Sequence, residues 1–298
     1  MRLLIAGSSG FLGSQLRASL ETAGHYVVRL VRGTPTAADQ IHWRPYDEPL
    51  DPAVLNDVDV VVNLAGSALV GNPHSSHWAN ELLRSRVETT RTLAEAIAKA
   101  PKQPAFLAGN ASGYYGDHGD ELLTESSKRR GDSLLSSVAS AWQDAAQPAV
   151  DAGGRVVVIR TAPVLDRRSP PLSLLAPLFK LGLGGPLGTG DQYFPVTTTD
   201  DWVCAVIFCA ENDALSGPVN ITLPEPATND EFTKALGDLV HRPTFFKVPG
   251  TVLRAAGPMA PELLGSVRLL PRVLLDAGFE FHHHDIRSAI AWALHAGR

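Results

Sequence analysis

The eight-residue stretch AGSSGFLG, from Ala6 to Gly13, decides the expected fold. It follows a short apolar run and precedes a helical pattern, so it predicts a turn between a buried strand and a helix. Gly7 permits a tight turn, Gly10 lets the backbone approach a pyrophosphate, and Gly13 permits close packing of the helix on the strand. The helix N-terminus adds N–H groups and the positive end of the helix dipole. This context predicts a dinucleotide-binding loop.

We expect the whole loop to contact the cofactor, through Gly7, Ser8, Ser9, Gly10, Phe11, Leu12 and Gly13. A second loop, NLAGS from Asn63 to Ser67, follows a later strand. Because the carboxyl ends of parallel strands meet at one edge of a sheet, this loop would pass the same cofactor. Its candidate contacts are Leu64, Ala65 and Gly66. The alternatives are a glycine-rich turn and a plain strand-end turn, neither of which holds a ligand.

Short apolar runs alternate with longer helical patterns over the first two thirds of the chain. The strand candidates are Leu3 to Ala6, Val27 to Val31, Val58 to Ala65, Ala105 to Ser112 and Arg155 to Thr161. These runs are β-branched and continuous, which is typical of strands buried on both faces. Strands that alternate with helices predict an α/β fold with a Rossmann-type, doubly wound parallel sheet.

The rhythm of strands and helices breaks after Thr161, where prolines and glycines cluster. We therefore expect an NADP-binding Rossmann domain over residues 1–165, with return segments at about 196–222. A smaller C-terminal α/β substrate lobe is expected over residues 166–298, partly interleaved with the first domain.

The bulk composition excludes several classes of protein. The chain has 298 residues, is 44% hydrophobic and 19% charged, and carries a net charge of −5. A protein whose main partner is nucleic acid needs a concentrated basic surface, which this balance does not favour. Two cysteines are too few for a disulfide scaffold. No run reaches the roughly 18 apolar residues needed to cross a bilayer. A cytoplasmic protein without a membrane or nucleic-acid partner is expected.

The end of the second expected strand bears on the choice of cofactor. Enzymes that use NAD often place Asp or Glu there to hold the ribose 2′-hydroxyl. Here the segment reads RLVRGTPTAAD, and the first acid after the strand, Asp39, lies beyond a loop. Arg32 is well placed to meet a 2′-phosphate, for which a planar guanidinium is suited. We predict NADP(H), with NAD(H) less favoured. The alternative is that Arg32 is an ordinary surface arginine.

These segments together resemble the extended short-chain dehydrogenase/reductases, and more closely an atypical branch, the YfcH-like epimerase family. The segments that carry the resemblance are AGSSGFLG, NLAGS, SRVETTRTL (Ser85 to Leu93), ASGYYGDHGDELLTE (Ala111 to Glu125), LGLGGPLGTGDQYF (Leu181 to Phe194) and LLPRVLLDAGFEF (Leu269 to Phe281). The resemblance covers essentially the whole chain. It implies a Rossmann domain, NADP(H) and a C-terminal substrate lobe, but no known substrate. We expect a small-molecule substrate such as a sugar or a carbonyl compound. Superfamily members often form homodimers, which stays open here.

The chain departs from the superfamily at the residues that transfer protons. There a Tyr and a Lys stand at Y-x-x-x-K on one helix, but the aligned positions here are Ser133 and Ser137. A serine hydroxyl is no acid or base near neutrality without help. A further departure is Thr198, at a position where the resembling family usually has His.

Three residues are candidates for the catalytic site: Asn110, Ser112 and Tyr115, which follow or end the fourth buried strand. They would orient a substrate oxygen, although Asn110 can donate a hydrogen bond to a carbonyl oxygen but cannot relay a proton. The alternative for Tyr114 and Tyr115 is packing and capping of the loop. Arg86, aligned with an Asn typical of the superfamily, would hold an anionic substrate or bridge to the cofactor. Its alternative is a surface salt bridge.

The leading prediction is an NADP(H)-binding oxidoreductase or an epimerase-like protein of unknown substrate. The absent Tyr and Lys keep open a catalytically degenerate sensor or interaction protein. A third alternative is a dehydratase or isomerase that uses bound cofactor without net redox change. No metal site is predicted, because the consecutive residues of the run His282 to His284 point to opposite faces of an extended stretch.

Overall fold

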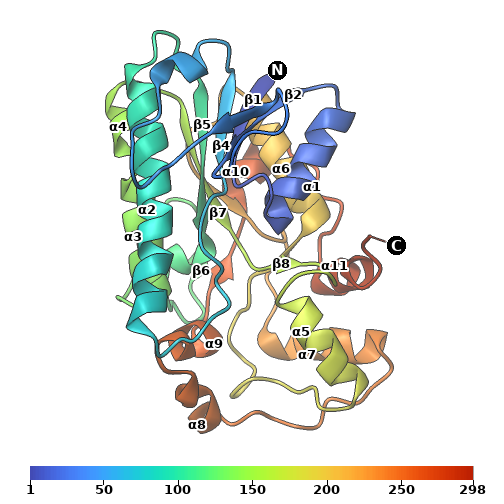
Figure 1. Ribbon diagram of the computed structural model, residues 1–298. Coiled ribbons are helices and arrows are strands. Elements are labelled where there is room, and N and C mark those ends of the chain that lie inside the picture. The colour runs from blue at the N-terminus through green and yellow to red at the C-terminus, as the bar shows by residue number, and fades with distance from the viewer. Residues whose placement is uncertain (298) are drawn as a thin grey trace. The chain divides into compact units, whose positions relative to one another are not determined.

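The computed structural model describes residues 1–297 (Figure 1). Two compact units make up the chain. Unit 1 comprises Met1–Asn110, Val138–Ile159 and Val203–Pro218, and unit 2 comprises Ala111–Ser137, Arg160–Trp202 and the chain from Val219 onward. The units are therefore interleaved in sequence.

A seven-stranded sheet has the order β10-β7-β5-β4-β1-β2-β3. Strand β1 pairs in parallel with both β2 and β4, and the β2–β3 and β4–β5 pairs are also parallel. The strands are β1 (Arg2–Ala6), β2 (Tyr26–Val31), β3 (Gln40–His42), β4 (Val60–Asn63), β5 (Ala105–Ala111), β7 (Val156–Thr161) and β10 (Gly217–Ile221). The predicted Rossmann-type α/β fold is confirmed.

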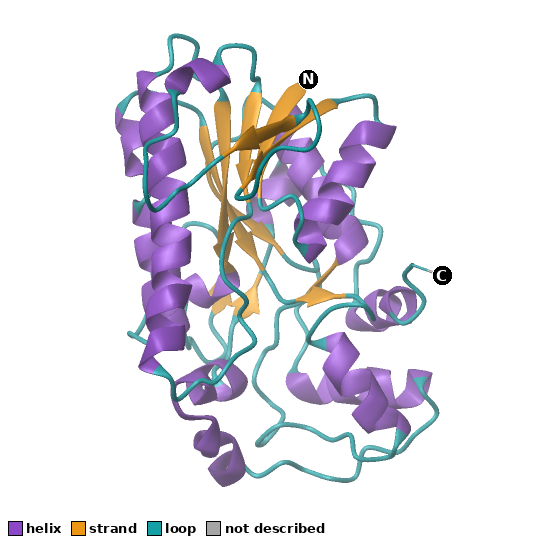
Figure 2. Ribbon diagram, viewed as in Figure 1, coloured by secondary structure: helices purple, strands orange, loops and turns teal. Residues whose placement is uncertain are grey.

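The helices of unit 1 lie on both faces of its strands: α2 and α4 on one side and α1 on the other (Figure 2). This unit holds α1 (Phe11–Thr22), η1 (Pro52–Leu55), α2 (Ser76–Lys99) and α4 (Gln147–Asp151). The division between the units runs through α3 (Leu134–Asp144) and α6 (Thr199–Glu211). Within residues 1–297, no helix is both long and apolar enough to cross a bilayer.

Unit 2 contains short elements around its own core. Its helices are η2 (Ser112–Tyr114), α5 (Leu172–Lys180), α7 (Asn229–Leu239), α8 (Gly250–Leu253), η3 (Arg254–Met259), α9 (Ala260–Leu264), α10 (Arg272–Asp276) and α11 (Ile286–Ala293). Two parallel pairs join β6 (Leu122–Leu123) to β11 (Arg268–Leu269) and β8 (Val164–Leu165) to β9 (Thr197–Thr198). The core packs α5, α7 and α11 together around side chains that include Phe179, Phe232 and Ile290.

Burial on both faces explains why the strand sequences of unit 1 are continuously apolar. Every residue of β4 is buried, and so are six of the seven residues of β5. Helices on both faces leave these strands no solvent side, so alternation of polar and apolar residues is not required. Leu4, Val61, Phe106 and Val158 belong to the resulting core.

The turn after β1 brings three backbone segments into contact. Gly7 has a φ of +83°, and a Cβ built on it would lie 2.6 Å from the carbonyl carbon of Leu64. A Cβ on Gly13 would lie 2.2 Å from the carbonyl oxygen of Gly7. Both positions therefore admit only glycine without a backbone shift.

Replacing Gly13 by alanine is expected to lower the free energy of unfolding by about 1–3 kcal/mol, because the backbone must move to admit the new Cβ. Urea unfolding followed by tryptophan fluorescence measures the change. Gly33→Ala is the matched control, since a Cβ there meets no atom within 4 Å, and it should leave stability unchanged or slightly raised. Equal stability of the two variants would contradict the close packing at Gly13.

Candidate functional site

The loop between β1 and α1 leaves the first turn of α1 open to an anion. Gly10 is the N-cap residue, and no side chain caps this end of the helix. The first turn also contains no acidic residue. Ser9 and Gly10 are exposed, whereas Ser8 and Gly13 are buried. Backbone N–H groups and the positive dipole end at such a terminus favour a phosphate.

Asn63 holds the second predicted loop, and the sequence analysis did not identify this role. Its Nδ2 donates to Thr90 Oγ1 at 2.9 Å, and its Oδ1 accepts from the N–H of Ala65 at 3.0 Å. The loop of Leu64, Ala65 and Gly66 is thereby tied to α2 and placed against Gly7. The structure thus brings the two predicted glycine-containing loops together. The one sequence signal for this role is an Asn at the end of a strand that is expected to be buried.

Arg86 on α2 lies beside this second loop. A Cβ on Gly66 would lie 3.4 Å from the Arg86 guanidinium, whose carbon is 5.2 Å from the centre of a Trp142 ring. Nη1 donates to the carbonyl oxygen of Leu82 at 3.1 Å. Burial lowers the pKa of Arg86 to about 10. No carboxylate of residues 1–297 pairs with this guanidinium, so the surface salt bridge considered above is not formed.

The two arginines near the end of β2 have different surroundings. Arg29 forms a bidentate ion pair with Asp39, with Nε–Oδ2 at 2.6 Å and Nη2–Oδ1 at 2.9 Å. The hydrogen bond from Arg29 lowers the pKa of Asp39. Arg32, directly after the strand, is exposed, and no ion pair joins it to the other described residues. Asp39 is therefore occupied, while Arg32 can meet an anion.

Asn110, in unit 1, is 4% exposed and its Nδ2 donates to the carbonyl oxygen of Ala139 at 2.9 Å. In unit 2, Ser112 is 6% exposed. Its hydroxyl makes no hydrogen bond with the residues that the structure describes. The Ser112 hydroxyl therefore stays available to a ligand, whereas the Asn110 amide is bound to the backbone.

Tyr115 belongs to a buried polar network of unit 2. Its hydroxyl donates to Asn220 Oδ1 at 2.7 Å and accepts from Arg160 Nη1 at 2.9 Å. The side chain is fully buried, and this burial raises the pKa of Tyr115. The Arg160 guanidinium also lies 3.7 Å from the centre of the Tyr114 ring. These contacts favour the packing alternative for Tyr115.

A carboxyl group stands beside one of the two serines that replace the Tyr and Lys. Ser133 Oγ donates to Glu262 Oε1 at 2.8 Å. Ser137 Oγ accepts from Arg129 and donates to the carbonyl oxygen of Asp132. Burial raises the pKa of Glu262. Sequence reasoning missed Glu262, because 129 residues separate it from Ser133 and no local pattern marks it.

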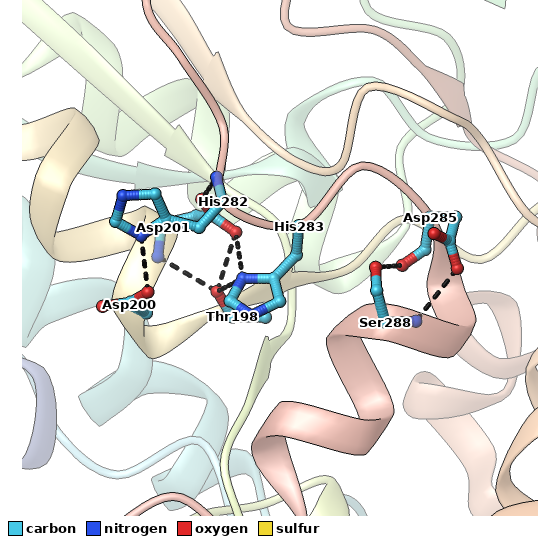
Figure 3. Close-up of polar contacts among 7 residues, drawn as sticks. All are labelled: Thr198, Asp200, Asp201, His282, His283, Asp285 and Ser288. Carbon is cyan, nitrogen blue, oxygen red and sulfur yellow. Dashed lines mark hydrogen bonds and ion pairs between the residues drawn. The ribbon is translucent and has the colours of Figure 1, made fainter.

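Histidine side chains lie near Thr198, the position at which the resembling family usually has His (Figure 3). His283 Nδ1 lies 2.9 Å from Asp201 Oδ2 and 3.4 Å from Thr198 Oγ1. His282 instead meets Asp200 at 2.6 Å, and this hydrogen bond raises the pKa of His282. A histidine from the C-terminal segment therefore supplies the imidazole near Thr198.

Tyr115→Phe is expected to lower the free energy of unfolding by about 1–3 kcal/mol, because Arg160 and Asn220 each lose a buried partner. Thermal and urea unfolding measure the change. Tyr114→Phe is the matched control: it keeps the ring under Arg160 and removes a hydroxyl that bonds to no described residue. Unchanged stability of Tyr115→Phe together with lost turnover would favour the catalytic role instead.

Comparison with known proteins gives matches along the whole chain. The model of the NAD dependent epimerase/dehydratase family matches residues 3–133, and a domain of unknown function, DUF1731, matches residues 248–293. An epimerase family protein of Mycobacterium tuberculosis is 41% identical over 97% of this chain and 96% of its own length. The epimerase family protein SDR39U1 of Homo sapiens is 32% identical over 97% of this chain and 98% of its own length.

Solved structures agree with these matches. Human SDR39U1, solved with NADPH, superposes with a TM-score of 0.87 at 30% identity, covering 99% of this chain and 100% of its own. A nucleoside-diphosphate sugar epimerase from Corynebacterium glutamicum has a TM-score of 0.81 at 35% identity, covering 99% of this chain and 58% of its own. MoeE5 with UDP-glucuronic acid and NAD has a TM-score of 0.75 at 22% identity and shares the fold. The chain belongs to the epimerase family, in the atypical extended branch of the short-chain dehydrogenase/reductases.

Proposed function

We propose that this protein binds NADP(H) through unit 1 and acts as an oxidoreductase or epimerase on a small molecule with a carbonyl or hydroxyl group. The observation that carries the proposal is Arg86. A half-buried guanidinium without a carboxylate partner is costly unless an anion meets it. Its place beside Gly66 makes a phosphate of the cofactor the natural partner.

The backbone around Gly7 supports the same ligand. Gly7 and Gly13 keep the loop compact, and the uncapped first turn of α1 offers N–H groups to a pyrophosphate. A bound nicotinamide would supply or accept a hydride at a substrate carbon. The orienting roles of Asn110 and Ser112 stay predictions, as do a homodimer and a cytoplasmic location.

Arg32 favours the phosphorylated form of the cofactor. Asp39, the acid that could hold a ribose 2′-hydroxyl, is bound to Arg29, and Arg32 presents an exposed guanidinium at the end of β2. The human relative was solved with NADPH, whereas more distant structures of the same fold hold NAD. The balance supports NADP(H) over NAD(H).

The second candidate is a protein that binds the cofactor without catalysis. The specific observation in its favour is that Ser133 and Ser137 replace the expected Tyr and Lys. Both candidates require cofactor binding, so only a measurement of catalytic turnover distinguishes them.

Arg32→Ala is expected to weaken NADPH binding by about 10- to 100-fold and to leave NADH binding unchanged, because only NADPH carries the 2′-phosphate that the guanidinium would meet. Calorimetric titration with each nucleotide measures this. Arg91→Ala, which removes another exposed arginine of unit 1, is the control and should change neither affinity. Equal loss for both nucleotides would contradict a 2′-phosphate contact, and no binding of either to the unaltered protein would contradict the proposed function.

Arg86→Met is expected to weaken the binding of both NADPH and NADH, since both carry the pyrophosphate. Without nucleotide, the variant should be as stable as the parent or more stable, because an unpaired half-buried cation has been replaced by an apolar side chain of similar length. Calorimetry and thermal unfolding measure the two effects. Lower stability with unchanged affinity would show that Arg86 serves the fold and not the ligand.

A further inference from the structure

Unit 2 contains a cavity of about 200 Å³ that no step above uses. Its walls come from α5, the segment after it, α7 and α9, with Leu174, Leu175, Phe179, Phe194 and Phe232 among the apolar side chains. In Figure 1, α5 lies next to α7. The rings of Phe194 and Phe232 meet edge to face at 5.4 Å, so this wall is well packed. The lining is predominantly apolar.

Two of the polar side chains in the wall, Gln192 and Asn229, already form hydrogen bonds with the backbone. Gln192 Nε2 donates to the carbonyl oxygens of Leu187 and Leu263, and Asn229 Oδ1 accepts from the N–H of Leu187 at 2.7 Å. They therefore close the wall and do not offer these groups to a ligand.

Among the residues that the structure describes, Glu262 is the only ionisable side chain in this wall. Ser133 Oγ donates to its Oε1 at 2.8 Å, which holds the carboxyl in place. Burial raises the pKa of Glu262, and the hydrogen bonds from Ser133 and from the backbone of Leu135 act in the opposite direction. When the carboxyl is protonated, it has an O–H to donate. A neutral carboxyl can donate to a carbonyl oxygen or accept from a hydroxyl.

The wall has the wrong chemistry for a nucleoside diphosphate. Within residues 1–297, no lysine or arginine lines it, and the one ionisable group there is an acid that would repel a phosphate when charged. The volume is also small. A cavity of about 150 Å³ lined by similar residues holds benzene, so about 200 Å³ admits a ligand on the order of ten non-hydrogen atoms.

We propose that this cavity binds the substrate, and that the substrate is a small apolar ketone or aldehyde, or the corresponding alcohol, whose single oxygen is held by Glu262. The proposal rests on the proposed function for its reaction class and names the substrate class. The family name would suggest a nucleotide sugar as the substrate, whereas this proposal names a compact apolar molecule. Ser133 acts as a positioning residue that orients the carboxyl.

The test measures binding of three probes to the purified full-length protein by calorimetry, with and without NADPH. The probes are 4-phenyl-2-butanone, butylbenzene as the hydrocarbon of similar shape, and UDP-glucose. The ketone is expected to bind about 3- to 10-fold more tightly than butylbenzene, which is the worth of one hydrogen bond. UDP-glucose is expected not to bind. Tighter binding of UDP-glucose than of the ketone would overturn the proposal.

Two variants locate the site. Leu174 is 57% exposed and lines the cavity, so Leu174→Trp should obstruct it and weaken ketone binding by about tenfold or more without disturbing the core. Leu181→Trp changes an exposed leucine at the C-terminal end of α5 that does not line the cavity, and it should leave the affinity unchanged. Equal ketone affinity in the two variants would overturn the proposed location.

Two further variants test the carboxyl. Glu262→Ala should abolish the preference for the ketone over butylbenzene, whereas Glu262→Gln should keep it, because the amide can still donate to the ketone oxygen. A preference that survives Glu262→Ala would overturn the role of Glu262.

The same titrations separate this proposal from the proposed function. If NADPH binds and the ketone does not, the substrate class is wrong and the proposed function stands. If the ketone binds as described and NADPH does not, the cavity is a ligand site and the proposed function is wrong.

Discussion

The contact between the backbones at Gly7, Gly13 and Leu64 is the constraint on which unit 1 depends. A Cβ at either glycine would overlap backbone atoms, at 2.6 Å for Gly7 and 2.2 Å for Gly13. Strand β1, helix α1 and the loop after β4 can meet this closely only because the two side chains are absent. The N-cap residue of α1 is Gly10, which has no side chain, so the first turn stays uncapped beside this contact.

The hydrogen-bond partners of two arginines, the buried Arg160 and the half-buried Arg86, distinguish a structural role from a ligand-binding role. Arg160, in unit 2, donates to the Tyr115 hydroxyl and to the Glu125 carbonyl oxygen, and it lies over the Tyr114 ring. Arg86, in unit 1, has a single backbone carbonyl and the face of Trp142. A satisfied cation holds a fold together, whereas a cation short of partners is a candidate for a ligand.

The C-terminal segment supplies an acid and an imidazole to two positions of unit 2. Glu262 comes to Ser133, and His283 comes to Asp201 and Thr198. Both lie within residues 248–293, the part that matches a domain of unknown function. Its short helices therefore do more than close unit 2. Helix α9 brings an acid to Ser133, at the position of the superfamily's Tyr, and the segment before α11 brings an imidazole to Thr198, where the resembling family usually has His.

The sequence by itself determined the parallel sheet, the glycine loop and the place of Arg32, because these depend on neighbouring residues: continuous apolar runs, glycine spacing and the residue that ends a strand. Tertiary structure decided the rest. Tyr115 meets Asn220 across 105 residues, and Glu262 meets Ser133 across 129. Asp39, near Arg32 in the sequence, is bound instead by Arg29. Which polar groups are satisfied and which await a ligand depends on contacts between distant segments, and no local pattern encodes them.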